Sequence, residues 1–193
     1  MPEYKSNADV VSKRVIKILG KIQRPPATLM ALVGQTIVVM NLDRIHSEGK
    51  ATDGGSIGYY STKPTLAGGK TFNNSGAAND FFNDPATEWV TLSKGGRSIR
   101  LAVVEGGYKE IRRRDNARTD IVDLKRTGDL FNSFQIIEAA TSDGVGVGFT
   151  TDKAAEIREG LEDHFSKRIW GLTDEEEGKV LQIIRTFVEQ QLK

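Results

Sequence analysis

The sequence of 193 residues contains no cysteine and only two histidines. Without cysteine, the chain has no disulfide framework, no thiolate metal site and no cysteine nucleophile. Neither His46 nor His164 lies in a metal-ligand spacing such as His-x-x-x-His, so each is best interpreted as a surface or helix-end residue. The sequence also lacks a Gly-x-Ser-x-Gly nucleophile elbow and a Walker phosphate loop. We therefore expect a protein that is not an enzyme and that uses no metal and no cofactor.

An excess of charge of either sign is lacking as well. The chain has 27 basic and 26 acidic residues and a net charge of +1, so any basic function must be local. The N-terminus has no apolar signal-peptide core. The longest apolar-rich stretch, residues 27–42, is interrupted by Gly34, Gln35 and Asn41, and is too short and polar to predict a membrane span. We expect a soluble protein with no membrane partner.

Apolar periodicity predicts two helices near the N-terminus. Residues 6–22 carry one apolar stripe, with Ser6 or Asn7 as the N-cap. A Pro-Pro pair ends this helix and prepares the start of the next. The second helix, residues 26–46, is apolar on several faces, so we expect it in the core or in a subunit interface.

Two further helices are predicted near the C-terminus. Residues 152–165 form one, with Thr151 or Asp152 as its N-cap. Residues 173–192 form the other and open with a Thr-x-x-Glu capping box that ends at Glu176. In such a box the two side chains satisfy each other's free backbone amides.

Strand patterns occupy the middle of the chain. Residues 88–92 and 98–104 predict two strands joined by a Lys-Gly-Gly turn. Alternatively, residues 98–114 form a helix, although Gly106 and Gly107 argue against a continuous one.

A second hairpin is predicted downstream. Residues 124–134 predict a helix, and residues 134–138 and 144–150 predict strands that turn at 141–144. Together the elements predict an α+β fold, in which a small antiparallel sheet or hairpin packs with N-terminal and C-terminal helices. The length suits a single domain of residues 1–193.

A long polar loop excursion interrupts this fold. Residues 47–85 are rich in glycine and small polar residues and cannot bury enough apolar surface for a core of their own. We assign residues 47–87 as an extended loop or arm. Its aromatic residues suggest that it folds against something, such as another subunit. These loop contact candidates are Tyr59, Tyr60, Phe72, Phe81 and Phe82.

Two features resemble binding sites but have simpler explanations. Residues 144–148 alternate glycine with valine at the period of a strand, and no helix follows directly to hold a phosphate. Asp43, Glu48 and Asp53 match no calcium-loop spacing, so no metal site is expected.

Basic residues concentrate at one place. The cluster consists of Lys109, Arg112, Arg113, Arg114, Arg118, Lys125 and Arg126. One interpretation is a patch that faces phosphates, because guanidinium groups bind them bidentately. The other is a solvated face, or a set of ion pairs with acidic groups of a neighbouring subunit.

An ordered series of short motifs resembles a known family. Residues 122–134 contain Leu-x-x-Thr-Gly-x-Leu-x-x-Ser, and a Gly-Val-Gly-Phe strand follows. Upstream, an arginine-ending helix precedes Asp-Gly-x-x-x-x-x-Tyr-Ser. The motif positions are Asp53, Gly54, Tyr60, Ser61, Leu124, Thr127, Gly128, Leu130, Ser133 and Gly148. The order resembles the virion-morphogenesis and tail-completion (neck, head–tail joining) family of tailed bacteriophages, over about residues 37–193. The stretch at 61–88 is long for this family.

The resemblance implies a structural virion protein, made in the host bacterial cytoplasm and located in the neck or tail of the virion. Such proteins form rings, often of six or twelve copies, that join the tail to the head connector. The implied partners are further copies of the chain, connector or portal-adaptor proteins, and tail tube or tail terminator proteins, with DNA passing transiently through the channel. Alternatives are a tail terminator or a head-closure ring protein.

Interface or DNA-channel candidates follow from this expectation. They are Lys109, Arg112, Arg113, Arg114, Arg118, Asp174, Glu175 and Glu176. A ring uses heterologous interfaces, so one face can be basic and the adjoining face acidic. A different class of function is a small nucleic-acid-binding module that uses the Arg112–Arg114 patch.

Overall fold

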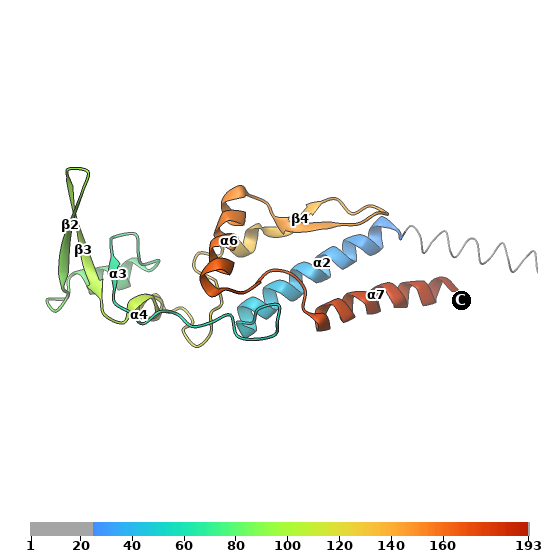
Figure 1. The fold of residues 1–193 in the computed structure, drawn as a ribbon, viewed down its shortest axis with the longest axis horizontal. Helices are drawn as coiled ribbons and strands as arrows, with labels where there is room; N and C mark the ends of the chain where they lie inside the picture. Colours follow the sequence, from blue (N-terminus) through green and yellow to red (C-terminus); the bar gives the residue numbers. More distant parts are fainter. Residues whose placement is uncertain (1–24, 193) are drawn as a thin grey trace, which may run out of the picture.

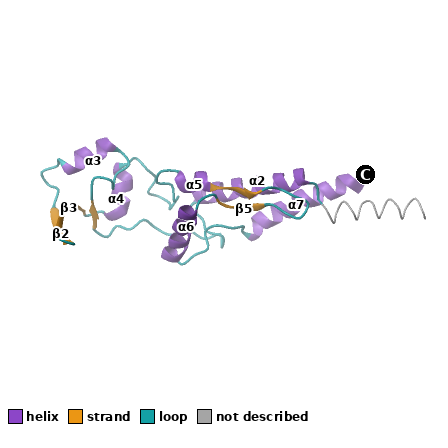
Figure 2. Ribbon diagram, turned by 90° about the horizontal axis from the view of Figure 1, so that it is seen from above, coloured by secondary structure: helices purple, strands orange, loops and turns teal. Residues whose placement is uncertain are grey.

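The computed structural model describes residues 25–192 and shows an elongated molecule with two parts (Figure 1; Figure 2). We call them the body and the arm. The body contains α2 (Ala27–Asp43), the π-helix η1 (Arg44–Glu48), α5 (Asp129–Ser133), β4 (Phe134–Glu138), β5 (Gly146–Phe149), α6 (Asp152–Phe165) and α7 (Asp174–Leu192). The arm contains β1 (Thr65–Ala67), α3 (Ser75–Phe82), β2 (Trp89–Lys94), β3 (Arg97–Val104) and α4 (Gly107–Arg114). The predicted helix at residues 6–22 lies outside the described residues.

The predicted α+β fold is confirmed. Its sheets are small and antiparallel, with three strands in the arm and two in the body. The long helix α2 contacts the C-terminal helix α7, and it also contacts β4 and β5. Figure 1 shows α2 lying between the hairpin and α7. Gly34 allows this close approach, since a Cβ there would lie 2.8 Å from Cγ2 of Val145.

The core of the body closes around Trp170. Its buried residues are Ile45, Ala51, Ile57, Tyr60, Val122, Phe134, Ile169 and Trp170. The ring of Trp170 contacts the rings of Phe131, Phe134 and Phe149. Each large side chain that is fully buried in this way contributes about 1.5–3 kcal/mol. Residues from the loop, the hairpin and the α6–α7 connection therefore share one core.

By length and composition, the helical run Ala27–Glu48 is the one helix among residues 25–192 that could cross a membrane. About a third of its tested window, 33%, is buried inside the protein. A core helix passes the same test. In this fold the run contacts α7 and the hairpin, and it holds the buried polar residues Asn41 and Arg44.

The predicted helix 26–46 ends in a π-helical turn. The turn η1 covers Arg44–Glu48, and Gly49 closes it in the left-handed region at φ 63°. Glycine is favoured there because other residues rarely adopt that conformation. A Cβ at Gly49 would also lie 2.8 Å from the Cβ of Ile121.

The predicted helix 124–134 is wrong in its first half. Only Asp129–Ser133 forms α5, and the preceding segment is irregular. Leu124 has φ 52° and Gly128 has φ 89°, and neither value is helical. The segment is held instead by Asp123, whose Oδ1 accepts a hydrogen bond from the amide of Lys125 at 3.0 Å.

The hairpin and the C-terminal helices follow the sequence predictions. Phe134–Glu138 pairs with Gly146–Phe149, so the second strand is shorter than predicted. Thr151 caps α6, because its side chain accepts from the amide of Ala154 at 3.2 Å. The capping box is confirmed by two hydrogen bonds, from the Thr173 amide to Glu176 Oε2 at 2.9 Å and from the Glu176 amide to Thr173 Oγ1 at 3.1 Å.

The arm is a sheet with two helices on one face. β3 lies between β1 and β2, and both neighbours pair with it in antiparallel register. The alternative helix over residues 98–114 is therefore wrong. The strand ends at Val104, and α4 begins at Gly107, which has φ 62°. A Cβ at Gly107 would lie 2.3 Å from the carbonyl oxygen of Lys63, so only glycine fits.

The stretch 47–87 acquires a core that its composition did not predict. It contributes β1 and α3, and these pack with β3 and α4. The buried residues of this second cluster are Ala67, Phe72, Ala78, Phe81, Ala102, Val104 and Ile111. The polar stretch has too few apolar residues to form a core alone. Pairing with β3 brings in the further buried residues Ala102, Val104 and Ile111.

Candidate interaction surfaces

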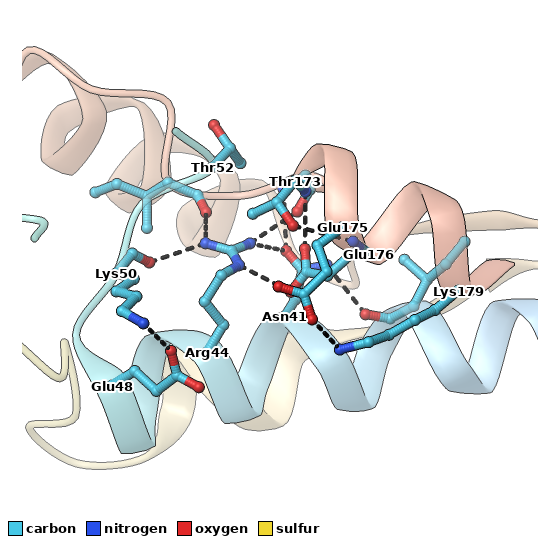
Figure 3. Close-up of polar contacts among 12 residues, drawn as sticks. Asn41, Arg44, Glu48, Lys50, Thr52, Thr173, Glu175, Glu176 and Lys179 are labelled. Atoms are coloured by element: carbon cyan, nitrogen blue, oxygen red, sulfur yellow. Dashed lines mark hydrogen bonds and ion pairs between the residues drawn. The ribbon is translucent and has the colours of Figure 1, made fainter. Parts of the chain in front are cut away.

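Arg44 is the centre of a buried polar network in the body (Figure 3). Its side chain is 7% exposed, and Nε donates to Oε1 of Glu176 at 2.9 Å. The other donors bind the carbonyl oxygens of Lys50, Ile169 and Gly171 and the side chain of Asn41. All five guanidinium donors are thus paired, which is the condition for burying this charge without a large penalty.

Glu176 and Asn41 complete the network from opposite sides. Glu176 accepts from Arg44 with one oxygen and from the Thr173 amide with the other. Asn41 accepts from the Gly171 amide at 2.9 Å and donates to the carbonyl of Ile37 at 3.0 Å. The network therefore joins α2 to the start of α7. Glu176 was predicted to lie at an interface, but it is buried and serves the fold.

An acidic hollow opens above this network, with a volume of about 430 Å³. Its lining includes six carboxylates against three cations: Asp43, Glu48, Asp53, Asp174, Glu175 and Glu176 against Arg44, Lys50 and Lys179. Lys50 pairs with Glu48 at 2.7 Å, and Lys179 pairs with Glu175 at 2.8 Å, as Figure 3 shows. Within residues 25–192, Asp43 and Asp174 form no ion pair. Asp53 pairs with Lys167 at 3.4 Å, so in this described part of the chain the negative charge that the hollow presents without an ion-pair partner comes from Asp43 and Asp174.

Arg112 forms a second buried centre where the arm meets the body. The residue is 3% exposed. Nη2 donates to Asp123 at 2.7 Å, and the other donors bind the carbonyl oxygens of Arg118 at 2.7 Å and Lys125 at 2.9 Å. The guanidinium also lies 4.4 Å from the ring centroid of Tyr60. Arg112 was predicted on a surface patch, and its burial corrects that prediction.

Tyr60 shares this centre. Its hydroxyl donates to Asp123 Oδ1 at 2.8 Å and accepts from the Asp123 amide at 3.1 Å. Burial, together with the hydrogen bond to that carboxylate, raises the pKa of Tyr60 well above its ordinary value. Tyr60 therefore acts as a neutral structural residue and does not face a partner.

The remaining basic residues are largely paired at the surface. Arg113 and Arg114 both bind Glu110, at 2.6 and 2.8 Å, and this pairing lowers the pKa of Glu110. Arg118 binds Asp120 at 3.0 Å and also donates to the carbonyl of His46 in η1. Lys109 is exposed. The cluster therefore does not form a continuous free patch for phosphates.

The predicted loop aromatics divide into one exposed residue and four internal ones. Tyr59 is 86% exposed. The rings of Phe72, Phe81 and Phe82 contact one another in tilted and edge-to-face arrangements, with centroid separations of 5.4 to 5.7 Å. Except for Tyr59, the loop aromatics thus pack within their own chain, and the predicted contact with another subunit is not needed to bury them.

Most of the family-like motif positions have structural roles. Thr127 accepts from the Asp129 amide, and Ser133 donates to the carbonyl of Leu130 at 2.7 Å. Gly128 starts α5 in the left-handed region, and a Cβ at Gly148 would lie 2.8 Å from Ile137. These residues shape the turn before the hairpin.

The loop motif is also structural. Asp53 accepts from the Gly55 amide at 2.9 Å, which lowers the pKa of Asp53, and Gly54 has φ 76°. Ser61 accepts from the amide of Lys63 at 3.2 Å. Leu124 and Leu130 line a larger hollow of about 690 Å³ beside α6.

The arm sheet has an apolar face that the sequence analysis did not predict. Cross-strand pairs place Leu66 opposite Val103, Val90 opposite Leu101, and Leu92 opposite Ile99. Because side chains alternate between faces, all six lie on the face opposite to Ala102 and Val104. Leu66, Val90, Leu92 and Ile99 are 37–48% exposed. Alternation within the predicted hairpin places the other five residues on one face, but only the tertiary structure shows that this face stays uncovered and that Leu66 joins it.

Among the described residues, no group of three or more histidine, cysteine, aspartate or glutamate side chains is arranged to hold a metal. Comparison with protein-family models, curated protein sequences and solved structures yields no match. The surfaces described above are therefore the basis for a functional assignment, together with the motif series.

Proposed function

We propose that this chain is a structural protein of a tailed-phage virion that acts in the neck, where rings of it join the tail to the head connector. The ordered motif series suggests the family. The exposed apolar face of the arm sheet is the observation that carries the proposal, because it calls for a protein partner. An apolar surface of this kind marks an interaction site when it is contiguous.

The geometry of the molecule supports an assembly role. The arm extends from one end of the body, so a neighbouring molecule can reach it (Figure 1). An interface between different surfaces of identical subunits generates a ring when the rotation closes. The internal use of Arg112 and the pairing of Arg113 and Arg114 leave less support for the alternative of a nucleic-acid-binding module.

The test is to delete the gene for this chain from a phage that encodes it. The expected result is that filled heads and finished tails accumulate separately, and that adding the purified protein to the lysate joins them. Tails of abnormal length would point to the tail terminator alternative, and heads that lose their DNA would point to head closure. Infectious particles with normal necks in the absence of the chain would contradict the proposal.

A further inference from the structure

We infer that the arm of one copy docks in the acidic hollow of a second copy of this chain. The inference rests on the proposed function, because it names the contact by which neighbouring copies would form the ring. It comes from two surfaces that complement each other in charge and in the order of their apolar and charged residues.

The first surface is the outer face of the arm hairpin. Residues 89–101 contain no acidic residue, and of their three basic residues Arg100 lies on the opposite face, over the ring of Trp89. Arg97 shares its face with Ile99 and Leu101, because these residues alternate along β3. From tip to base, this face therefore presents a cation and then exposed apolar side chains. Ile99 is 48% exposed.

The second surface is the hollow and the helices that leave it. On α2, Asp43 is one turn from Val39, and on α7, Asp174 is two turns from Leu181. Val39 and Leu181 are both 64% exposed. Along each helix the surface thus begins with a carboxylate and continues with an exposed apolar side chain.

The spacing on the two surfaces agrees. Two residues along a strand separate Arg97 from Ile99 by about 7 Å. Four residues along a helix separate Asp43 from Val39 by about 6 Å. An arm laid along α2 would therefore place its cation near Asp43 and its first apolar residue near Val39.

A second copy is the occupant that fits. In both views the hairpin of β2 and β3 lies at the opposite end of the molecule from α2 and α7, so it does not reach the hollow of its own chain (Figure 1; Figure 2). The arm and the hollow are different surfaces, so the contact is heterologous and repeats from copy to copy. The carboxylates of Asp43 and Asp174 complement the positive charge of Arg97 near the tip.

Cross-linking tests the contact directly, because the natural chain has no cysteine. One protein carries Ile99→Cys and another carries Val39→Cys, and both keep the charges intact. The full-length proteins are mixed with a short bis-maleimide. The expected product is a dimer that contains one copy of each protein, and a chain with both substitutions should form a ladder. The control pairs Ile99→Cys with Glu159→Cys on α6, where little product is expected.

Charge reversal provides a second, independent test. Arg97→Glu in one protein, or Asp43→Lys with Asp174→Lys in the other, should lower the cross-linking yield by about tenfold or more, since like charges then face each other. Mixing the two reversed proteins should restore the yield. Equal yields in all combinations, or dimers that form from the Ile99→Cys protein alone, would overturn the inference.

The outcomes separate this inference from the proposed function. If the chain joins heads to tails but does not cross-link between arm and hollow, the contact is wrong and the neck role stands. If cross-linking succeeds but particles assemble normally without the chain, the contact stands between copies and the neck role is wrong.

Discussion

The body and the arm differ in how much of their apolar surface is covered. In the body, helices, hairpin and loop close around Trp170, and the one guanidinium at its centre has all five donors paired. In the arm, α3 and α4 cover one face of the sheet, and the other face keeps exposed apolar residues. Pairing every donor of a buried guanidinium keeps its burial from destabilising the fold. An uncovered apolar face lowers the solubility of a protein, and such a face is typical of a surface that binds a partner.

The two tryptophans allow this difference to be measured. Trp89 lies in β2 of the arm, and Trp170 lies in the core of the body. Replacing either with phenylalanine leaves a single fluorescent reporter for the other part. Each prediction below can therefore be followed in the arm and in the body separately.

The largest effect is expected in the body. Arg44→Leu leaves Glu176 buried without its cation and should lower the free energy of unfolding by about 3–5 kcal/mol. Urea denaturation measures the change. The double variant Arg44→Leu with Glu176→Leu removes both charges and should recover much of the loss. An effect of Arg44→Leu below about 1 kcal/mol would show that the network is not buried as described.

A second large effect is expected where the arm meets the body. Arg112→Leu leaves Asp123 without its ion pair, and we expect the free energy of unfolding to fall by about 3 kcal/mol. The fluorescence of both tryptophans should show this change. Its neighbour is the matched control, because Arg113 is 67% exposed and Arg113→Leu should change stability by less than about 0.5 kcal/mol. Equal effects of the two substitutions would contradict the buried position of Arg112.

Gly107→Ala is expected to disturb mainly the arm. The new Cβ would clash with the carbonyl oxygen of Lys63, and the backbone at this position is left-handed. We therefore expect the free energy of unfolding to fall by about 2–3 kcal/mol. Gly96→Ala is the control, since Gly96 has φ 74° but open space around it, and about 1 kcal/mol is expected. Thermal unfolding followed by Trp89 should show the difference. A loss seen only by Trp170 would contradict this assignment.

Tyr60→Phe should cost about 1–2 kcal/mol near neutral pH, because the hydroxyl hydrogen bonds to Asp123 are lost. Burial raises the pKa of Tyr60 in the folded state above the ordinary value of 10.0. Its contribution is therefore fully present below pH 10.0 and is lost as the pH rises toward the folded-state pKa. Denaturation at increasing alkaline pH should show a steeper loss for the natural chain than for Tyr60→Phe. Parallel curves would refute the burial of this hydroxyl.

The smallest effect on stability is expected on the outer face of the arm. Ile99→Thr should change the free energy of unfolding by less than about 0.5 kcal/mol, because the side chain is half exposed. Val104→Thr, on the covered face of the same strand, should cost about 1–3 kcal/mol because it buries a hydroxyl. Chemical denaturation of both variants compares the faces. Similar losses would mean that the two faces are equally buried.

The predictions from sequence succeeded where the interactions are local. The Thr173–Glu176 capping box, the Thr151 cap and the Phe134–Phe149 hairpin each depend on residues close in the chain. The first half of the predicted helix 124–134 failed because the side chains of Arg112 and Asn73 bind the carbonyl oxygens of Lys125 and Arg126, which a helix would use for its own hydrogen bonds. Local propensity is overridden when tertiary hydrogen bonds compete with it.

The buried networks around Arg44 and Arg112 were even less predictable from the sequence. Arg112 and Glu176 are charged residues that a sequence places on the surface by default. Glu176 pairs with Arg44, 132 positions away in the chain, and Asp123, the ion-pair partner of Arg112, is held by Tyr60, 63 positions away. No periodicity or motif reports such pairs.

By itself, the sequence determined the α+β class, the ends of the C-terminal helices, the second hairpin and the absence of cysteine chemistry. These follow from turn residues, caps and periodic apolar positions, which act over a few residues. Only the tertiary structure decided that residues 65–67 pair with β3, that Arg44 and Arg112 are internal, and that one face of the arm stays uncovered. Those outcomes require distant segments to meet, because burial and ion pairing depend on which surfaces the whole chain brings together.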